Sequence, residues 1–240
     1  MREWACVSGV MGMRGFVGAL AGVVAGLAFG SGASAQSAWY VSGSLGGTFR
    51  QDVSGPVTFF DVQDRSVTAP GTSRAVFGTG LSADLAVGYR ISSSFRVEAE
   101  LGYEDFAQTA LYPMTTSALF PNLRGQQFSH ASGGDDSALS SAVNGFYDFP
   151  TVAGRFTPYL GGGAGVVSGR GADTEFISAH GVHFESEGGS GVRGLVQGEA
   201  GVAVRLSRNL SVVPAYRYIH FTGPRADGES VAKLGLRYAF

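Results

Sequence analysis

The sequence predicts an all-β fold, an eight-stranded antiparallel up-and-down transmembrane β-barrel preceded by a cleaved signal peptide. Three observations lead to this prediction. Eight segments alternate apolar and polar residues with the two-residue period of a β-strand. The connections between them are alternately long and short, as in outer-membrane barrels. Beyond the N-terminal region no run approaches the roughly 18 apolar residues of a membrane helix, so a spanning chain has to close into a barrel.

The first 35 residues have the pattern of a secretory signal peptide. An apolar run over residues 16–29 follows Arg14 and precedes a small-x-small sequence that ends at Ala35. The run is too short and too rich in glycine for a membrane anchor. We therefore expect a signal peptide over residues 1–35 and a barrel domain over residues 36–240. Three methionines could start the leader: Met1, Met11 and Met13.

Composition excludes two classes of function. The single cysteine, Cys6, lies in the leader, so we expect no disulfide and no thiol chemistry in the exported domain. The leader also holds two of the 17 basic residues and one of the 19 acidic residues, which leaves the domain a net charge of about −3. This balance does not suit a polyanion, so nucleic acid is not an expected partner. No cofactor is expected either.

In each predicted strand, apolar side chains occupy one face and polar side chains the other. The alternation is clearest over residues 95–104, where aromatic and aliphatic residues alternate with Arg96, Glu98, Glu100 and Glu104. The eight segments cover residues 39–50, 81–91, 95–104, 139–149, 156–167, 193–205, 210–218 and 231–240.

The connections indicate which way the strands run. Short turns are predicted at residues 92–94, 150–155 and 207–209, and longer loops after residue 50 and at residues 105–138, 168–192 and 221–230. An even number of strands places both termini on the periplasmic side. Within the seventh strand we expect a β-bulge at Pro214, because proline cannot donate a ladder hydrogen bond.

A soluble barrel of the lipocalin type is the alternative fold. Such a barrel turns its apolar side chains inward. Aromatic residues near the strand ends instead suit two girdles at the membrane interfaces, which favours the membrane barrel. The aromatic residues concerned are Trp39, Phe49, Phe95, Tyr103, Phe149, Phe156, Tyr218 and Phe240.

The last ten residues alternate strictly and end on an aromatic residue. Leu236, Tyr238 and Phe240 share the apolar face of this strand. The strand resembles the C-terminal insertion signal of Gram-negative outer-membrane barrels. That resemblance implies that the three residues direct membrane insertion and that the barrel-assembly machinery is a partner at this step.

The terminal Tyr238-Ala239-Phe240 and three further stretches carry a wider resemblance: Asn144-Gly145-Phe146-Tyr147-Asp148-Phe149, Thr157-Pro158-Tyr159-Leu160-Gly161-Gly162-Gly163 and Tyr216-Arg217-Tyr218. The chain is similar to the opacity-protein-like and outer membrane protein A-like β-barrels, a surface-antigen family of Gram-negative bacteria. The resemblance implies an outer-membrane location, contact with membrane lipid and lipopolysaccharide, and a role in envelope integrity or surface interaction. It implies no shared catalytic site.

Charged residues of both signs share the inward face of the predicted barrel. Eight strands enclose a space that side chains just fill, and an unpaired charge there is unfavourable. We therefore expect a lumen plugged by a network of ion pairs, with a small pore for ions or solutes as the alternative function. The expected members are Arg96, Glu98, Glu100, Glu104, Glu199, Arg205, Arg217 and Arg237.

An outer-leaflet lipid-modifying enzyme is a distant alternative. His180 and His183 lack the third ligand that a zinc site needs. His220 and Thr222 resemble the His-x-Ser pair of lipid A deacylases, but no third group is identified that would orient the base. We expect no enzyme, no catalytic residue and no metal site. The three glycines 161–163 are expected to make room for long side chains from the opposite wall.

Two loop features complete the analysis. The acidic pairs Asp135-Asp136 and Asp227-x-Glu229 are expected to be solvated turns rather than cation sites. The apolar sequences 111–114 and 118–121 are expected either to cover the barrel mouth or to form a partner-binding patch. Together these observations predict a monomeric outer-membrane barrel that presents four loops at the cell surface.

Overall fold

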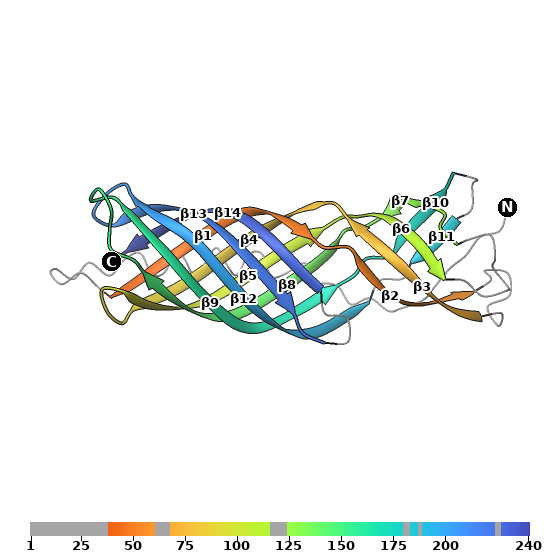
Figure 1. Ribbon diagram of the computed structural model, residues 1–240, viewed down its shortest axis with the longest axis horizontal. Coiled ribbons are helices and arrows are strands. Elements are labelled where there is room, and N and C mark those ends of the chain that lie inside the picture. Colours follow the sequence, from red (N-terminus) through yellow and green to blue (C-terminus); the bar gives the residue numbers. More distant parts are fainter. Residues whose placement is uncertain (1–37, 61–67, 116–123, 180–182, 187–188, 224–226) are drawn as a thin grey trace.

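The computed structural model describes residues 38–60, 68–115, 124–179, 183–186, 189–223 and 227–240. All regular elements in these ranges are β-strands, arranged as two sheets that follow one another along the long axis (Figure 1). The predicted signal peptide and the sequence 118–121 lie outside the described residues. In the described part, no helix is long and apolar enough to cross a membrane.

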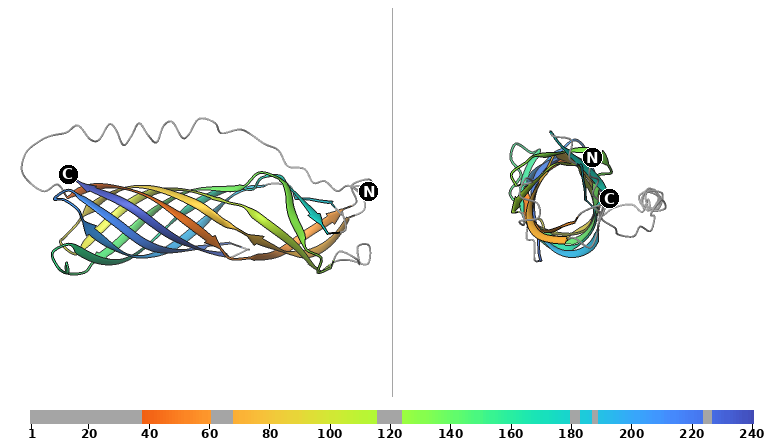
Figure 2. Two further views of the ribbon diagram at one scale, coloured as in Figure 1. Left: turned by 90° about the horizontal axis from the view of Figure 1, so that it is seen from above. Right: turned by 90° about the vertical axis from the view of Figure 1, so that its right-hand side faces the viewer.

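Eight antiparallel strands close into a barrel, which confirms the predicted fold class. The order around the wall is β1-β14-β13-β12-β9-β8-β5-β4, and β4 pairs again with β1. The end-on view in Figure 2 shows the closed wall. The barrel strands are β1 (Trp39–Arg50), β4 (Thr79–Arg90), β5 (Phe95–Phe106), β8 (Asp136–Asp148), β9 (Phe156–Arg170), β12 (Ser190–Arg205), β13 (Leu210–Phe221) and β14 (Asp227–Ala239).

One end of the barrel, here named the turn end, carries the three short connections and the C-terminus. Two of these turns are built alike. The Ser92 hydroxyl accepts hydrogen bonds from the amides of Ser94 and Phe95 at 3.3 and 3.1 Å. The Ser207 hydroxyl accepts corresponding hydrogen bonds two and three residues on, at 3.4 and 3.1 Å. The short turns therefore lie where the sequence predicts them, fixed by local side-chain hydrogen bonds.

The other end, named the hairpin end, continues into a second sheet of order β11-β10-β7-β6-β3-β2 (Figure 1). Its strands are β2 (Val53–Phe60), β3 (Thr68–Phe77), β6 (Gln108–Thr115), β7 (Phe128–Gly133), β10 (Thr174–Ser178) and β11 (His183–Ser186). The prediction of loops here was wrong. Register shifts at two places between β3 and β6 and at one place between β10 and β7 interrupt the two-residue alternation locally, which weakens the strand pattern of these segments.

The second sheet has a small apolar core of its own. Leu111, Phe128 and Phe176 are buried together, with Ala75 packed against them. Leu111 is therefore neither a lid on the barrel nor part of an exposed patch, whereas Met114 in the same strand is 46% exposed. This core fixes the hairpins to one another.

No bulge occurs at Pro214, contrary to the prediction. The register between β12 and β13 is the same on both sides of the site, from Gly201↔Ala215 to Val204↔Val212, and Pro214 itself pairs with Leu234 of β14. The ladder between β12 and β13 is interrupted at this position instead. The missing N–H of the proline is thus accommodated without an extra residue.

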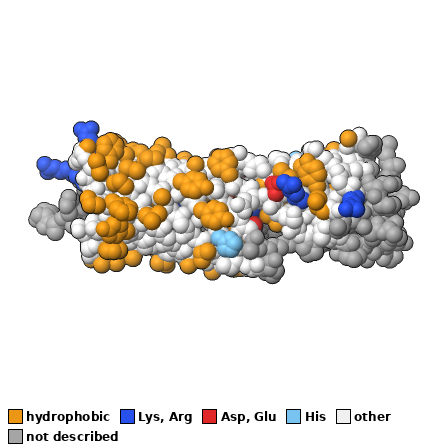
Figure 3. All heavy atoms as spheres, in the orientation of Figure 1, with side chains coloured by type: hydrophobic (Ala, Val, Ile, Leu, Met, Phe, Trp, Pro, Cys, Tyr) orange, Lys and Arg blue, Asp and Glu red, His pale blue; other side chains and the backbone are white. Residues whose placement is uncertain are grey.

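Apolar side chains cover the outside of the barrel (Figure 3). Leu45, Leu81 and Val143 are 71%, 68% and 65% exposed. At the turn end, exposed aromatic rings pack edge to face, with 5.0 Å between the ring centroids of Trp39 and Tyr89. An apolar surface with an aromatic belt is the outer face expected of a membrane barrel and not of a lipocalin-type one.

Candidate functional site

Arg96 is the centre of a buried polar layer near the turn end. Its Nε donates to Asp148 Oδ1 at 3.0 Å, and its Nη1 donates to Tyr40 Oη at 3.1 Å and also pairs with Glu98. The guanidinium lies 3.8 Å from the ring centroid of Phe146. Arg96 is 1% exposed, and Tyr40 is wholly buried and donates to Glu98 at 2.6 Å. Charge, hydrogen bonds and ring stacking together hold this arginine in a fixed position.

A second layer, deeper in the barrel, is centred on Arg217. The Arg217 Nη2 atom lies 2.5 Å from Glu100 and 2.8 Å from Glu199, and Nη1 lies 3.5 Å from Asp84. Lys233 Nζ lies 2.7 Å from Glu199 and 3.3 Å from Asp84. Two cations are therefore shared among three carboxylates away from water, and each carboxylate has at least one ion pair.

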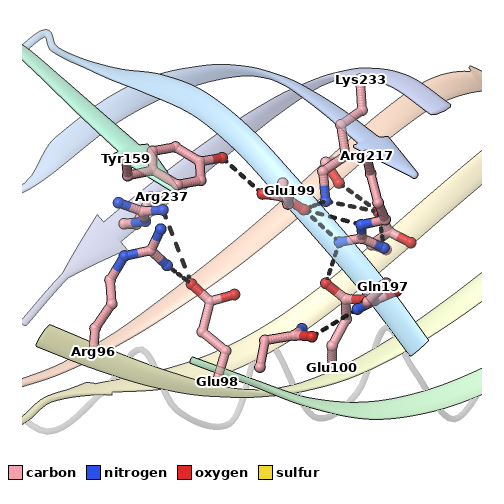
Figure 4. Close-up of polar contacts among 12 residues, drawn as sticks. Arg96, Glu98, Glu100, Tyr159, Gln197, Glu199, Arg217, Lys233 and Arg237 are labelled. Carbon is pink, nitrogen blue, oxygen red and sulfur yellow. Dashed lines mark hydrogen bonds and ion pairs between the residues drawn. The ribbon is translucent and has the colours of Figure 1, made fainter. Parts of the chain in front are cut away.

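Tyr159 joins the two layers (Figure 4). Its hydroxyl donates to Glu199 at 2.7 Å in the deeper layer. Its ring lies 4.7 Å from the Arg96 guanidinium and 5.6 Å from that of Arg237. Arg237 in turn lies 3.9 Å from Glu98. The two layers consequently form one connected network.

Two glycines of β9 make room for neighbouring side chains, not for residues of the opposite wall as predicted. A Cβ atom on Gly163 would overlap the side chain of Asn144, and one on Gly161 would overlap the ring of Phe146. Both neighbours belong to the adjacent strand β8. The space lets Asn144 accept a hydrogen bond from Gln197 at 2.7 Å. The two glycines thus leave space for the side chains of the network along this part of the inner wall.

All eight barrel strands contribute to the network. Its members are Tyr40 and Ser44 of β1, Asp84 of β4, Arg96, Glu98 and Glu100 of β5, Asn144, Phe146 and Asp148 of β8, Tyr159 of β9, Gln197 and Glu199 of β12, Arg217 of β13, and Lys233 and Arg237 of β14. A cavity of about 30 Å³ remains among them, bordered by Glu98, Glu100 and Lys233. A cavity of this size has room for one or a few ordered water molecules.

Most of the charged residues expected in the lumen lie there. Arg96, Glu98, Glu100, Glu199, Arg217 and Arg237 are in the network, and all of them are buried. Glu104 is also buried, nearer the hairpin end. Arg205 instead lies exposed at the turn-end mouth and has no ion pair within the described residues. Sequence analysis missed Tyr40, Tyr159 and Gln197. These residues are uncharged, but they have inward parity, which means that they occupy the alternate strand positions whose side chains face the lumen.

A separate cluster closes the hairpin end of the barrel. Asp227 accepts from Arg50 Nη2 at 2.5 Å and from Arg193 Nη1 at 2.6 Å. The Arg50 guanidinium lies 4.8 Å from the ring centroids of both Phe77 and Phe106. Asp227 is 7% exposed, so the prediction of a solvated turn at this residue was wrong. The reason is that β14 begins at Asp227, which places this residue inside the barrel mouth.

Glu229 is also inside the barrel, not in a solvated turn as predicted. It is wholly buried, and neither of its carboxylate oxygens has a hydrogen-bond partner within the described residues. The buried hydroxyl oxygens of Thr48 and Ser82 also have no hydrogen-bond partner in the part of the chain that the structure describes. This acidic site lies apart from the compensated network.

The residues considered for catalysis do not assemble. His220 lies on the outward face of β13, between the exposed Tyr218 and Thr222, and the Thr222 hydroxyl donates to the carbonyl of Gly194 at 3.1 Å. His180 and the side chain of His183 lie outside the described residues. In the described ranges, no three metal-ligating side chains gather at one point.

The three residues of the expected insertion signal lie on the outer face at the barrel seam, where the last strand β14 pairs with the first strand β1. Leu236 and Tyr238 are 54% and 47% exposed. The ring centroids of Tyr238 and Phe240 are 5.5 Å apart, and the Phe240 amide donates to the Trp39 carbonyl at 3.3 Å. The end of the chain is thus fastened to the first barrel strand.

Comparison with known proteins gives one family. The model of the outer membrane protein beta-barrel domain matches residues 19–240. Among solved structures, Neisserial surface protein A is 15% identical (86% of this chain and 100% of that chain covered, TM-score 0.47). OprG from Pseudomonas aeruginosa is 14% identical (85% and 97%, TM-score 0.46), and the protease OmpT from Escherichia coli is 10% identical (88% and 99%, TM-score 0.43). No curated protein matches the sequence.

Proposed function

Because this chain belongs to the family of outer membrane protein β-barrel domains, we propose that it is a structural and surface-interaction protein with a closed lumen. It is a barrel of the Gram-negative outer membrane. The barrel anchors the second sheet, which stands on the cell surface, and the turn end faces the periplasm. We propose that the protein acts as a monomer and without enzymatic activity.

The observation that carries this proposal is the network that all eight strands share. A path for ions would have to pass Arg96 and Arg217, which are held from several sides by carboxylates. Opening such a path would separate buried charges from their partners, which is strongly unfavourable. Closed lumens of this kind favour a scaffold over the alternative, a small pore.

The second sheet supports a role at the surface. Its hairpins share a ladder and an apolar core, so the barrel carries a continuous platform rather than separate loops. A preformed surface loses less conformational entropy on binding than flexible loops do. Membrane lipid and lipopolysaccharide around the barrel, and the assembly machinery during insertion, are the partners that we propose.

We expect the purified protein to give no stable large conductance in planar lipid bilayers. The lumen is filled by interlocked side chains, whereas open aqueous channels occur in barrels of about 16 strands. Recordings over a range of voltages would check this. Uniform, ion-selective channels from the folded protein would contradict the closed lumen and favour the pore.

The surface position of the second sheet is tested by labelling whole cells. The only native cysteine is Cys6, so a single introduced thiol reports its own location. Met114→Cys, at an exposed position of the second sheet, should react with a membrane-impermeant maleimide in intact cells. The matched variant Arg208→Cys, in an exposed turn at the opposite end, should react only after the outer membrane is permeabilised. Labelling of Arg208→Cys but not Met114→Cys would reverse the orientation and contradict surface presentation.

A further inference from the structure

A basic cavity opens at the turn end, between the Arg96 layer and the barrel mouth. Its volume is about 350 Å³, within the range of small-molecule sites. Four arginines line it: Arg90, Arg205, Arg208 and Arg237. Among the described residues, Asp148 is the only acidic side chain in the lining, which also includes Phe240. Basic side chains also project from this tip of the molecule in Figure 3.

Strand geometry directs three of these arginines into the barrel mouth. Arg237 shares the inward face of β14 with Lys233, while its neighbour Tyr238 faces outward. Arg90 and Arg205 have the inward parity of β4 and β12 in the same way. The guanidinium groups therefore converge on the cavity rather than on the lipid around the barrel.

The positive charge of the cavity is largely uncompensated. Asp148 is already bound by Arg96 at 3.0 Å. Within the described residues, Arg90, Arg205 and Arg208 form no ion pair. Arg237 is 6% exposed; its Nη2 atom lies 3.9 Å from Glu98, and its buried Nε has no hydrogen-bond partner in the described structure. Even with the terminal carboxylate of Phe240 counted as an acid, arginines outnumber acids at the cavity.

We propose that this cavity is a binding site for a small, multiply charged phosphate-type anion that enters from the periplasm. Guanidinium groups recognise phosphate oxygens through paired hydrogen bonds, and several arginines around one pocket suit more than one phosphate group. The floor of the cavity is the closed network, so the anion enters and leaves by the same mouth. The site therefore binds its ligand without transporting it.

Isothermal titration calorimetry with inorganic pyrophosphate tests the site, using the folded protein in a neutral detergent. The wild-type protein should bind with saturation at one site per chain. Arg205→Gln and Arg90→Gln should each weaken binding about tenfold, because each removes a charge-assisted contact. Arg155→Gln is the matched control: it removes an exposed arginine at the same end that does not line the cavity, and it should bind like the wild type.

A second arm distinguishes a soluble anion from a phospholipid headgroup. The pyrophosphate titration is repeated in nanodiscs of phosphatidylcholine and of phosphatidylglycerol. Equal binding in both supports a soluble ligand, and loss of binding only in phosphatidylglycerol supports a headgroup phosphate in the same site. An equal effect of Arg155→Gln and Arg205→Gln, or the absence of saturable binding by the wild type, would overturn the proposal.

Discussion

Replacing Arg217 with Met is expected to lower the free energy of unfolding by about 3–5 kcal/mol. The arginine contacts three buried carboxylates, and only Lys233 would remain to compensate them. Glu100→Gln should destabilise the barrel less, because Arg217 keeps Glu199 as a partner. Denaturant titration in detergent, followed by heat-modifiable gel mobility, measures both effects.

Glu229→Gln is the matched control for this experiment. It makes the same chemical change as Glu100→Gln at another buried site, but its carboxylate has no hydrogen-bond partner in the described structure. Removing its charge should leave stability unchanged or raise it. The double variant Glu100→Gln/Arg217→Met should be less destabilised than the sum of the single variants. Equal losses from Glu100→Gln and Glu229→Gln would show that the network has no specific stabilising role.

Deleting Phe240 is expected to reduce the amount of protein in the outer membrane several-fold and to increase its degradation in the periplasm. The residue directly follows β14, packs its ring edge to face against Tyr238, and donates its amide hydrogen to the Trp39 carbonyl. Outer-membrane fractions probed by immunoblot, with and without heating, measure the effect. Phe156→Ala is the control, since Phe156 is another exposed aromatic residue at the turn end. Normal levels of a heat-modifiable protein after the deletion would refute a role of Phe240 in insertion.

The barrel could be predicted from sequence because burial and strand period agree there. In β5, Arg96, Glu98, Glu100 and Glu104 are all buried, whereas the alternate positions Val97, Ala99, Leu101 and Tyr103 are exposed. One face of each strand contacts lipid and the other faces a closed lumen, and these two environments require apolar and polar residues to alternate along the strand. The strands of the second sheet do not lie between lipid and a closed lumen, so their sequences lack this strict alternation and they were not predicted.

The partners within the lumen could not be predicted in the same way. The alternation along a strand indicates that a side chain points inward. It does not indicate the position of the side chain along the barrel axis or the residue that it contacts. Arg205 has inward parity and still lies at the mouth, because it is the last residue of β12. Conversely, β14 begins earlier than predicted, which brings Asp227 and Glu229 inside. Strand ends, which short-range patterns define poorly, decided both outcomes.

The seam between β1 and β14 has a consequence for how the molecule forms. Tyr40 pairs with Ala239, near the two ends of the barrel sequence. The ion pair between Arg50 and Asp227 joins residues 177 positions apart, and that between Glu100 and Arg217 joins residues 117 apart. Such a high contact order makes folding slow, since much chain entropy is lost before these contacts form.

Until the seam closes, the growing sheet has two open edges that can pair with other chains. Its inward charges also lack their partners from the last two strands, so a partly built wall contains unbalanced carboxylates. Closure then joins the two edges and brings Lys233 and Arg237 of β14 to buried carboxylates of the other strands. We therefore expect assembly to be cooperative, because the final strand both closes the wall and supplies cations to the charged network inside it.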